Sequence, residues 1–160
     1  MDGSLFDFKA ESIDGLEINL ADYKDKAKAF LIVNVASACG LTNSNYKQLT
    51  EIYTELKPQG LEILAFPCNQ FAAQESKCNL DIKKFAKESY KVEFPMFSKI
   101  DVNGESSSAL YKFLRSQGKV EKIPWNFSKF LLDRNGKFVA FYPHHASPMS
   151  FKKDIEDLLQ

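Results

Sequence analysis

The chain has 160 residues, of which 44% are hydrophobic and 26% charged, a composition that fits one soluble domain spanning residues 1–160. Basic and acidic residues both number 21, so the formal charge is zero and the basic excess typical of nucleic-acid-binding proteins is absent. The N-terminal residues do not resemble a secretory signal, no apolar run is long enough to span a bilayer, and three cysteines do not suit a disulfide framework, so we expect a reducing, cytoplasmic setting.

Strands and helices alternate in the first half of the chain. Residues 29–37 form an almost uninterrupted apolar run, which predicts a fully buried strand. Residues 41–56 have helical spacing, with Thr42 or Asn43 as the expected N-terminal cap. Residues 61–66 predict a second buried strand.

The second half continues the pattern with helices at 79–90, 107–116 and 150–159, a short extended piece at 94–100, and a hairpin of 127–133 with 137–142. This order predicts an α/β fold with a central mixed sheet flanked by helices. Ligands bind outside the carboxyl ends of the parallel strands in such folds. Cys39 and the segment 67–70 both follow predicted strands, so we expect them to meet at one edge of the sheet.

Cys39 stands between a buried strand and a helix. The free N–H groups at a helix N-terminus favour the thiolate, which is the nucleophilic form of cysteine. Thr42 occupies the place where a Cys-x-x-Cys exchanger has its second cysteine, so the remaining chemistry is oxidation to a sulfenic acid and repair by another thiol. The alternative role for Cys39 is that of a small buried apolar residue.

Neutral hydrogen-bonding side chains follow in two other segments. Gln70 and Gln74 come after a Pro-Cys-Asn turn, and Trp125, the only tryptophan, precedes Asn126. Each alone is an ordinary loop or core residue. Together they would stabilise a thiolate and donate hydrogen bonds to a departing oxygen, which suits attack on a peroxide better than attack on a carbonyl.

The other reactive side chains give weaker signals. Cys68 follows a buried strand and is expected to be structural, whereas Cys78 lies in a polar helix start and is expected to be exposed. Neither has the spacing of a metal site. His144 and His145 are expected in a surface loop, although one of them would be the base if the protein were a cysteine hydrolase.

Three motifs of the chain resemble the glutathione peroxidase family. They are Asn-Val-Ala-Ser before Cys39-Gly40, the run Leu-Ala-Phe-Pro-Cys-Asn-Gln-Phe at 64–71 with Gln74-Glu75, and Trp-Asn-Phe at 125–127, within a resemblance that extends from Phe6 to Leu159. The resemblance implies a thioredoxin-like fold. It also implies a catalytic tetrad of selenocysteine or cysteine, glutamine, tryptophan and asparagine, matched here by Cys39, Gln74, Trp125 and Asn126.

The chain departs from that family in three places. The usual glycine pair is Ala72-Ala73, and the usual proline after Glu75 is Ser76. Thioredoxin-dependent members carry a resolving cysteine where this chain has Lys87, which leaves Cys78 as a possible resolving residue. The segment 118–124 lacks the insertion of tetrameric members, so the resemblance implies a monomer of the phospholipid-hydroperoxide type.

We therefore expect a thiol-dependent peroxidase that reduces hydrogen peroxide and organic or lipid hydroperoxides through a Cys39 sulfenic acid. The expected reductant is glutathione or a thioredoxin-like protein, with no metal or bound cofactor and with transient contact to membrane lipids. The alternative is a redox sensor or relay that passes its oxidation to a partner protein. Turnover with a small reductant separates the two.

Overall fold

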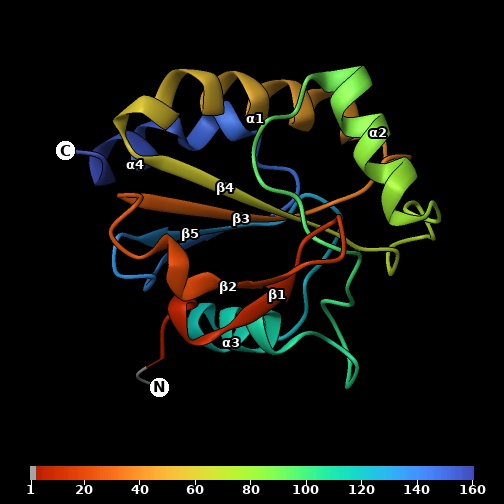
Figure 1. The fold of residues 1–160 in the computed structure, drawn as a ribbon, viewed down its shortest axis with the longest axis horizontal. Coiled ribbons are helices and arrows are strands. Elements are labelled where there is room, and N and C mark those ends of the chain that lie inside the picture. Colours follow the sequence, from red (N-terminus) through yellow and green to blue (C-terminus); the bar gives the residue numbers. More distant parts are fainter. Residues whose placement is uncertain (1–2) are drawn as a thin grey trace.

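A four-stranded mixed sheet runs through the centre of the computed structural model, which describes residues 3–160 (Figure 1). The strand order is β4-β3-β5-β6, with β3 parallel to β4 and antiparallel to β5. The C-terminal ends of β3 and β4 therefore lie at the same edge as the start of β5 and the end of β6. The strands are β3 (Ala29–Val35), β4 (Leu61–Pro67), β5 (Lys129–Asp133) and β6 (Phe138–Tyr142).

Both faces of the sheet are covered (Figure 1). Helices α1 (Thr42–Leu56), α2 (Asn79–Tyr90) and α4 (Lys152–Leu158) lie on one face, and helix α3 (Ala109–Gly118) lies on the other. Alternate residues of β3 point to opposite faces, so Leu31 and Val33 join the cluster with α1 while Phe30 and Ile32 join the cluster with α3. This two-sided burial is why the whole of β3 is apolar apart from one asparagine.

The predicted α/β class with a mixed sheet is confirmed, and the element boundaries differ by a few residues. Helix α3 begins and ends two residues later than expected, and residues 94–100 form only two isolated bridges instead of a strand. Strand β5 begins at Lys129 because Phe127 has a positive φ of 64°, which extended backbone does not have. Residues 3–160 also contain four short 3₁₀ helices: η1 (Leu5–Asp7), η2 (Leu20–Tyr23), η3 (Lys57–Gln59) and η4 (Pro148–Phe151).

The expected cap of α1 is wrong. Leu41 holds the N-cap position and makes no capping hydrogen bond through its side chain. Thr42 lies inside the helix, and its hydroxyl is used in the preceding turn, where it donates to the backbone oxygen of Ala36. Asn43 is exposed on the first helical turn.

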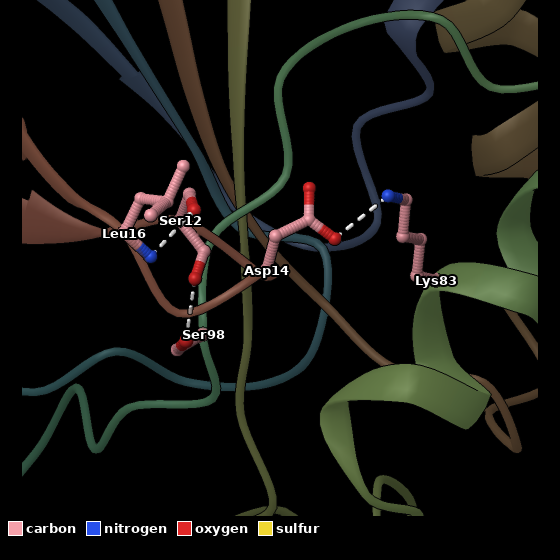
Figure 2. Close-up of polar contacts among 5 residues, drawn as sticks. All are labelled: Ser12, Asp14, Leu16, Lys83 and Ser98. Carbon is pink, nitrogen blue, oxygen red and sulfur yellow. Dashed lines mark hydrogen bonds and ion pairs between the residues drawn. The ribbon is translucent and has the colours of Figure 1, made fainter.

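A short N-terminal hairpin of β1 (Lys9–Glu11) and β2 (Glu17–Asn19) was not predicted. Figure 2 shows how its turn is fastened: the Leu16 N–H donates to Ser12 Oγ over 3.1 Å, and Ser98 Oγ donates to the Ser12 carbonyl over 2.7 Å. Asp14 forms an ion pair of 2.7 Å with Lys83 of α2. The hairpin therefore ties α2 to the segment 94–100. Within residues 3–160, no helix has the length and apolarity needed to cross a bilayer.

Candidate active site

Cys39 lies in the turn between β3 and α1 and is half-buried. The hydroxyl of Thr42 accepts a hydrogen bond from the Cys39 N–H over 3.1 Å and donates to the Ala36 carbonyl over 2.7 Å. The N–H of Leu41, at the N-cap of α1, donates to Cys39 Sγ over 3.4 Å. The turn is thus fixed from both sides, and the sulfur accepts a hydrogen bond from the N-cap residue of α1.

The loop after β4 lies against this turn. The Cys68 N–H donates to the Val35 carbonyl over 3.1 Å, which extends the pairing of β3 and β4 beyond the strand ends. The Ala38 N–H donates to the Gln74 carbonyl over 3.1 Å, so Gln74 lies beside the residue that precedes Cys39. The expected meeting of the two segments at one edge of the sheet is confirmed.

The segment 125–127 completes the arrangement. Asn34 near the end of β3 donates through Nδ2 to the Trp125 carbonyl over 3.2 Å, and its own carbonyl accepts from the Phe127 N–H over 2.7 Å. The fully buried Asn126 donates through Nδ2 to Gln74 Oε1 over 2.9 Å. The three predicted segments therefore lie together.

The half-buried indole of Trp125 packs against the ring of Phe71, with the ring centroids 5.6 Å apart. Phe71 belongs to the same loop as Gln74, so this contact and the amide pair both join the loop to the segment 125–127.

Gln70 is a correction to the expected set of donors. Its Oε1 accepts from the backbone N–H groups of Val102, over 2.7 Å, and Asn103, over 3.0 Å, and its Nε2 donates to the Asn103 carbonyl over 2.9 Å. The amide is therefore engaged by the backbone of residues 102–103. Sequence spacing did not separate its role from that of Gln74.

Glu75 was missed as a site residue, although it was part of a quoted motif. Its side chain is completely buried, directly after Gln74, and its N–H donates to Asn69 Oδ1 over 2.9 Å. Burial raises the pKa of its carboxyl above the ordinary value of 4.5, and the nearby Ser37 only partly offsets this. Nothing in the sequence signals that an acidic residue in a polar loop turns inward.

The two remaining thiols are unbridged. Cys68 is buried, and burial raises its pKa to about 11, which keeps it protonated and unreactive. Cys78 is exposed at the N-cap of α2. Both match their expected environments.

The two histidines lie in the loop after β6, with their rings edge-to-face and the centroids 5.3 Å apart. Burial, followed by the charges of His145 and Lys129, lowers the pKa of His144. Among the residues described, neither imidazole makes a hydrogen bond to Cys39, so the arrangement gives no support to a cysteine hydrolase. Residues 3–160 also contain no cluster of three or more histidine, cysteine, aspartate or glutamate side chains that would hold a metal ion.

Comparison with known proteins identifies close relatives. The glutathione peroxidase family model matches residues 5–115. A probable phospholipid hydroperoxide glutathione peroxidase of Citrus sinensis is 51% identical over 160 residues, which covers 98% of this chain and 95% of the relative. Glutathione peroxidase 1 of Caenorhabditis elegans is 46% identical and covers 98% of this chain and 96% of its own. The crystal structure of T. cruzi GPX1 superposes with a TM-score of 0.79 at 35% identity, covering 98% and 97% of the two chains.

Proposed function

The chain belongs to the glutathione peroxidase family, and we propose that it reduces hydrogen peroxide and organic hydroperoxides through the thiolate of Cys39. The observation that carries this assignment is the hydrogen-bonded junction of three segments. Gln74 is bonded to the Cys39 turn through its carbonyl and to Asn126 through its side chain. A nucleophilic thiol and a group of neutral donors therefore occupy one edge of the sheet.

In the oxidation step, the Cys39 thiolate attacks one oxygen of the peroxide and the O–O bond breaks. The sulfur becomes a sulfenic acid, and the departing alkoxide or hydroxide takes a proton to become an alcohol or water. Gln74, Trp125 and Asn126 are the proposed donors that stabilise the thiolate and the departing oxygen, because uncharged, pre-positioned donors stabilise developing negative charge.

In the reduction step, an external thiol condenses with the sulfenic acid to give a mixed disulfide and water. A second thiol then attacks the mixed disulfide. This step releases the Cys39 thiol and joins the two reductant thiols in a disulfide. The proposed reductant is glutathione or a thioredoxin-like protein. We propose the external-thiol route because Lys87 stands at the place of the family's resolving cysteine and Cys78 is the N-cap of α2, at the other end of the loop from β4.

Lipid hydroperoxides are proposed as substrates by analogy with the Citrus sinensis relative. The short connection between the end of α3 at Gly118 and Trp125 supports a monomer whose site edge is open to bulky peroxides and to transient contact with a lipid surface. The three unbridged cysteines support a reducing compartment, and we propose the cytoplasm.

Substitution of the nucleophile tests the proposal. Cys39→Ser is expected to abolish peroxide reduction in an assay coupled to glutathione or thioredoxin oxidation. Cys68→Ser, which alters a buried thiol outside the proposed chemistry, should keep most of the activity if the fold is retained in circular dichroism. Turnover by the Cys39→Ser variant would rule out the mechanism.

A further inference from the structure

The carboxyl group of Glu75 is an unusual feature of this edge of the sheet. It is completely buried, and neither carboxyl oxygen has a hydrogen-bond partner of good geometry. An ionised carboxylate is expensive to bury without a partner, so such a group is retained only where its surroundings use it.

Two hydroxyl groups share this environment. Ser37 lies two residues before Cys39. Burial raises the pKa of Glu75, and the hydroxyl and N–H of Ser37 partly lower it. Tyr46 of α1 is fully buried, and burial followed by the charge of Glu75 raises the pKa of its phenol. The hydroxyls of Ser37 and Tyr46 are, like the carboxyl of Glu75, buried and without a partner of good geometry. An uncharged carboxylic acid has one donor and further acceptors, so it can exchange hydrogen bonds with both hydroxyls, whereas a carboxylate can only accept.

The position of this group connects all three site segments. Glu75 directly follows Gln74, whose carbonyl binds the Cys39 turn. The ring of Tyr46 packs edge-on against Phe127, next to Asn126, with the ring centroids 5.6 Å apart. Glu75 thus lies beside the Cys39 turn, and Tyr46, whose phenol its charge affects, contacts the segment that carries Asn126.

We propose that Glu75 is a positioning residue that holds the loop carrying Gln74 against Ser37 of the Cys39 turn and against Tyr46 of α1. This inference rests on the proposed function, because its effect is exerted through Gln74 on the oxidation of Cys39. A misplacement of a reacting group by about 1 Å costs on the order of 10²-fold in rate.

The test compares Glu75→Gln with Glu75→Ala, with Glu62→Gln as the matched control. Glu62 is a partly buried carboxyl with a raised pKa, like Glu75, but it lies on β4 and accepts a hydrogen bond from Tyr53. The rate of Cys39 oxidation by hydrogen peroxide is measured by rapid quenching, alkylation and mass spectrometry. At neutral pH, Glu75→Ala should slow oxidation about 10–100-fold, whereas Glu75→Gln and Glu62→Gln should stay within about threefold of wild type.

The pH profile gives a readout that a purely structural role would not move. Charged and titratable groups face Glu75 from each neighbouring element: Tyr46 of α1, Lys77 before α2, Lys99 of the segment 94–100, and Cys68 after β4. When Glu75 ionises at higher pH, its negative charge opposes the Cys39 thiolate. The ratio of wild-type to Glu75→Gln oxidation rates should therefore fall as the pH rises.

Three results would overturn the inference: wild-type oxidation by a folded Glu75→Ala variant, a Glu75→Gln defect as large as that of Glu75→Ala, or a rate ratio independent of pH. The last measurement decides the matter if Glu75→Ala does not fold. If wild-type Cys39 itself fails to react with peroxide, the proposed function fails instead, so the two failures are distinguishable.

Discussion

The amide of Gln74 has a fixed orientation because Asn126 donates to its Oε1 atom. An amide has an acceptor end and a donor end, so once Oε1 is occupied the Nε2 group is presented as the donor. Among the described residues, Nε2 of Gln74 has no acceptor. Asn126 therefore acts on the site partly by determining which end of Gln74 is available to a thiolate or a peroxide oxygen.

This orientation leads to a prediction for the three donor residues. Gln74→Ala, Asn126→Ala and Trp125→Phe should each slow Cys39 oxidation by about 10²–10³-fold, the usual cost of losing one positioned donor. Asn126→Asp should be equally slow despite its similar shape, because a carboxylate accepts and would turn the Gln74 amide around. Stopped-flow oxidation rates are the measurement.

Gln70→Ala is the control for these variants, because this amide binds the backbone of residues 102–103 instead of facing the donors. It should lower stability and leave the oxidation rate near that of wild type. Near-wild-type oxidation in all the donor variants would reduce Gln74, Asn126 and Trp125 to structural residues.

Only the site residues that stand in recognisable motifs could be predicted from the sequence. Cys39, Gln74, Trp125 and Asn126 follow strand ends or stand in recognisable runs, so their meeting at one edge was predictable. The family resemblance singled out Gln74, but the role of Gln70 was not predictable, because backbone groups more than thirty residues away engage it. The burial of Glu75 could not be predicted either, because the groups around it, Ser37 and Tyr46, are distant from it in the sequence.

At the scale of elements, the loop between β4 and α2 is strained where the family usually has glycines. Ala72 and Ala73 have positive φ values of 56° and 52°, and both are exposed. Left-handed backbone costs an L-residue about 1–2 kcal/mol, while glycine adopts it freely. The alanine pair thus holds the loop in its site conformation at a cost in stability.

Ala72→Gly and Ala73→Gly should each raise the free energy of unfolding by about 0.5–1 kcal/mol, because relief of strain exceeds the extra entropy of glycine in the unfolded chain. Urea denaturation measures the change. Ala21→Gly, in η2, is a control that should destabilise, since this residue has no positive φ to relieve. A loss of stability in both loop variants would contradict the strain argument.

The start of α2 determines whether Cys78 can reach Cys39. Asn79 Oδ1 accepts a hydrogen bond from the Lys99 N–H over 3.0 Å, and the Asp14–Lys83 ion pair holds the next turn of the helix. Cys39 and Cys78 are unbridged, and a disulfide needs Cα atoms within about 7 Å, so these contacts oppose any movement of Cys78 toward Cys39.

We therefore expect that one equivalent of peroxide, with glutathione present, gives a glutathione adduct on Cys39 as the main product in mass spectrometry. Cys78→Ser should leave turnover largely unchanged. A dominant Cys39–Cys78 disulfide, with thioredoxin-dependent turnover lost in Cys78→Ser, would replace the external-thiol route by a two-cysteine cycle.

The elements that the sequence did not predict share a physical cause. Strands β1 and β2 have three residues each, are mostly exposed and contain no apolar run. Their hairpin is held in place by contacts with residue 98 and with α2. The expected cap at Thr42 failed because its hydroxyl is taken by the Cys39 turn. Long buried elements follow from periodicity, whereas short ones depend on tertiary contacts.

Across the whole molecule, the two-sided burial of the sheet also encloses a lysine. Lys129 of β5 is completely buried, and its Nζ donates to the carbonyls of Ala146, over 2.7 Å, and His144, over 3.4 Å. Among residues 3–160 no carboxylate forms an ion pair with Lys129, and burial lowers its pKa from 10.5 to about 7. The Lys129 side chain joins the loop after β6 to the sheet, although burying its amine costs desolvation free energy.

The pH dependence of stability follows from that shift. Between about pH 7 and pH 10.5 the unfolded lysine binds more protons than the folded one, so wild-type stability should rise with pH relative to Lys129→Met, by at most about 1.4 kcal/mol per pH unit. Below about pH 7 the difference should become constant. Urea denaturation of both proteins across this range is the measurement, and parallel stability curves would show that Lys129 is not buried as a neutral amine.

Trp125 gives the molecule a further property. It is the only indole in the chain, and it lies half-buried between Phe71 and the Asn126 segment, at the edge of the sheet where Cys39 is found. The intrinsic fluorescence of tryptophan therefore arises from a single place, at the same edge of the sheet as the group whose oxidation state changes in the proposed cycle. Emission intensity should report the conversion of thiol to sulfenic acid and back in real time, so the protein contains its own optical probe.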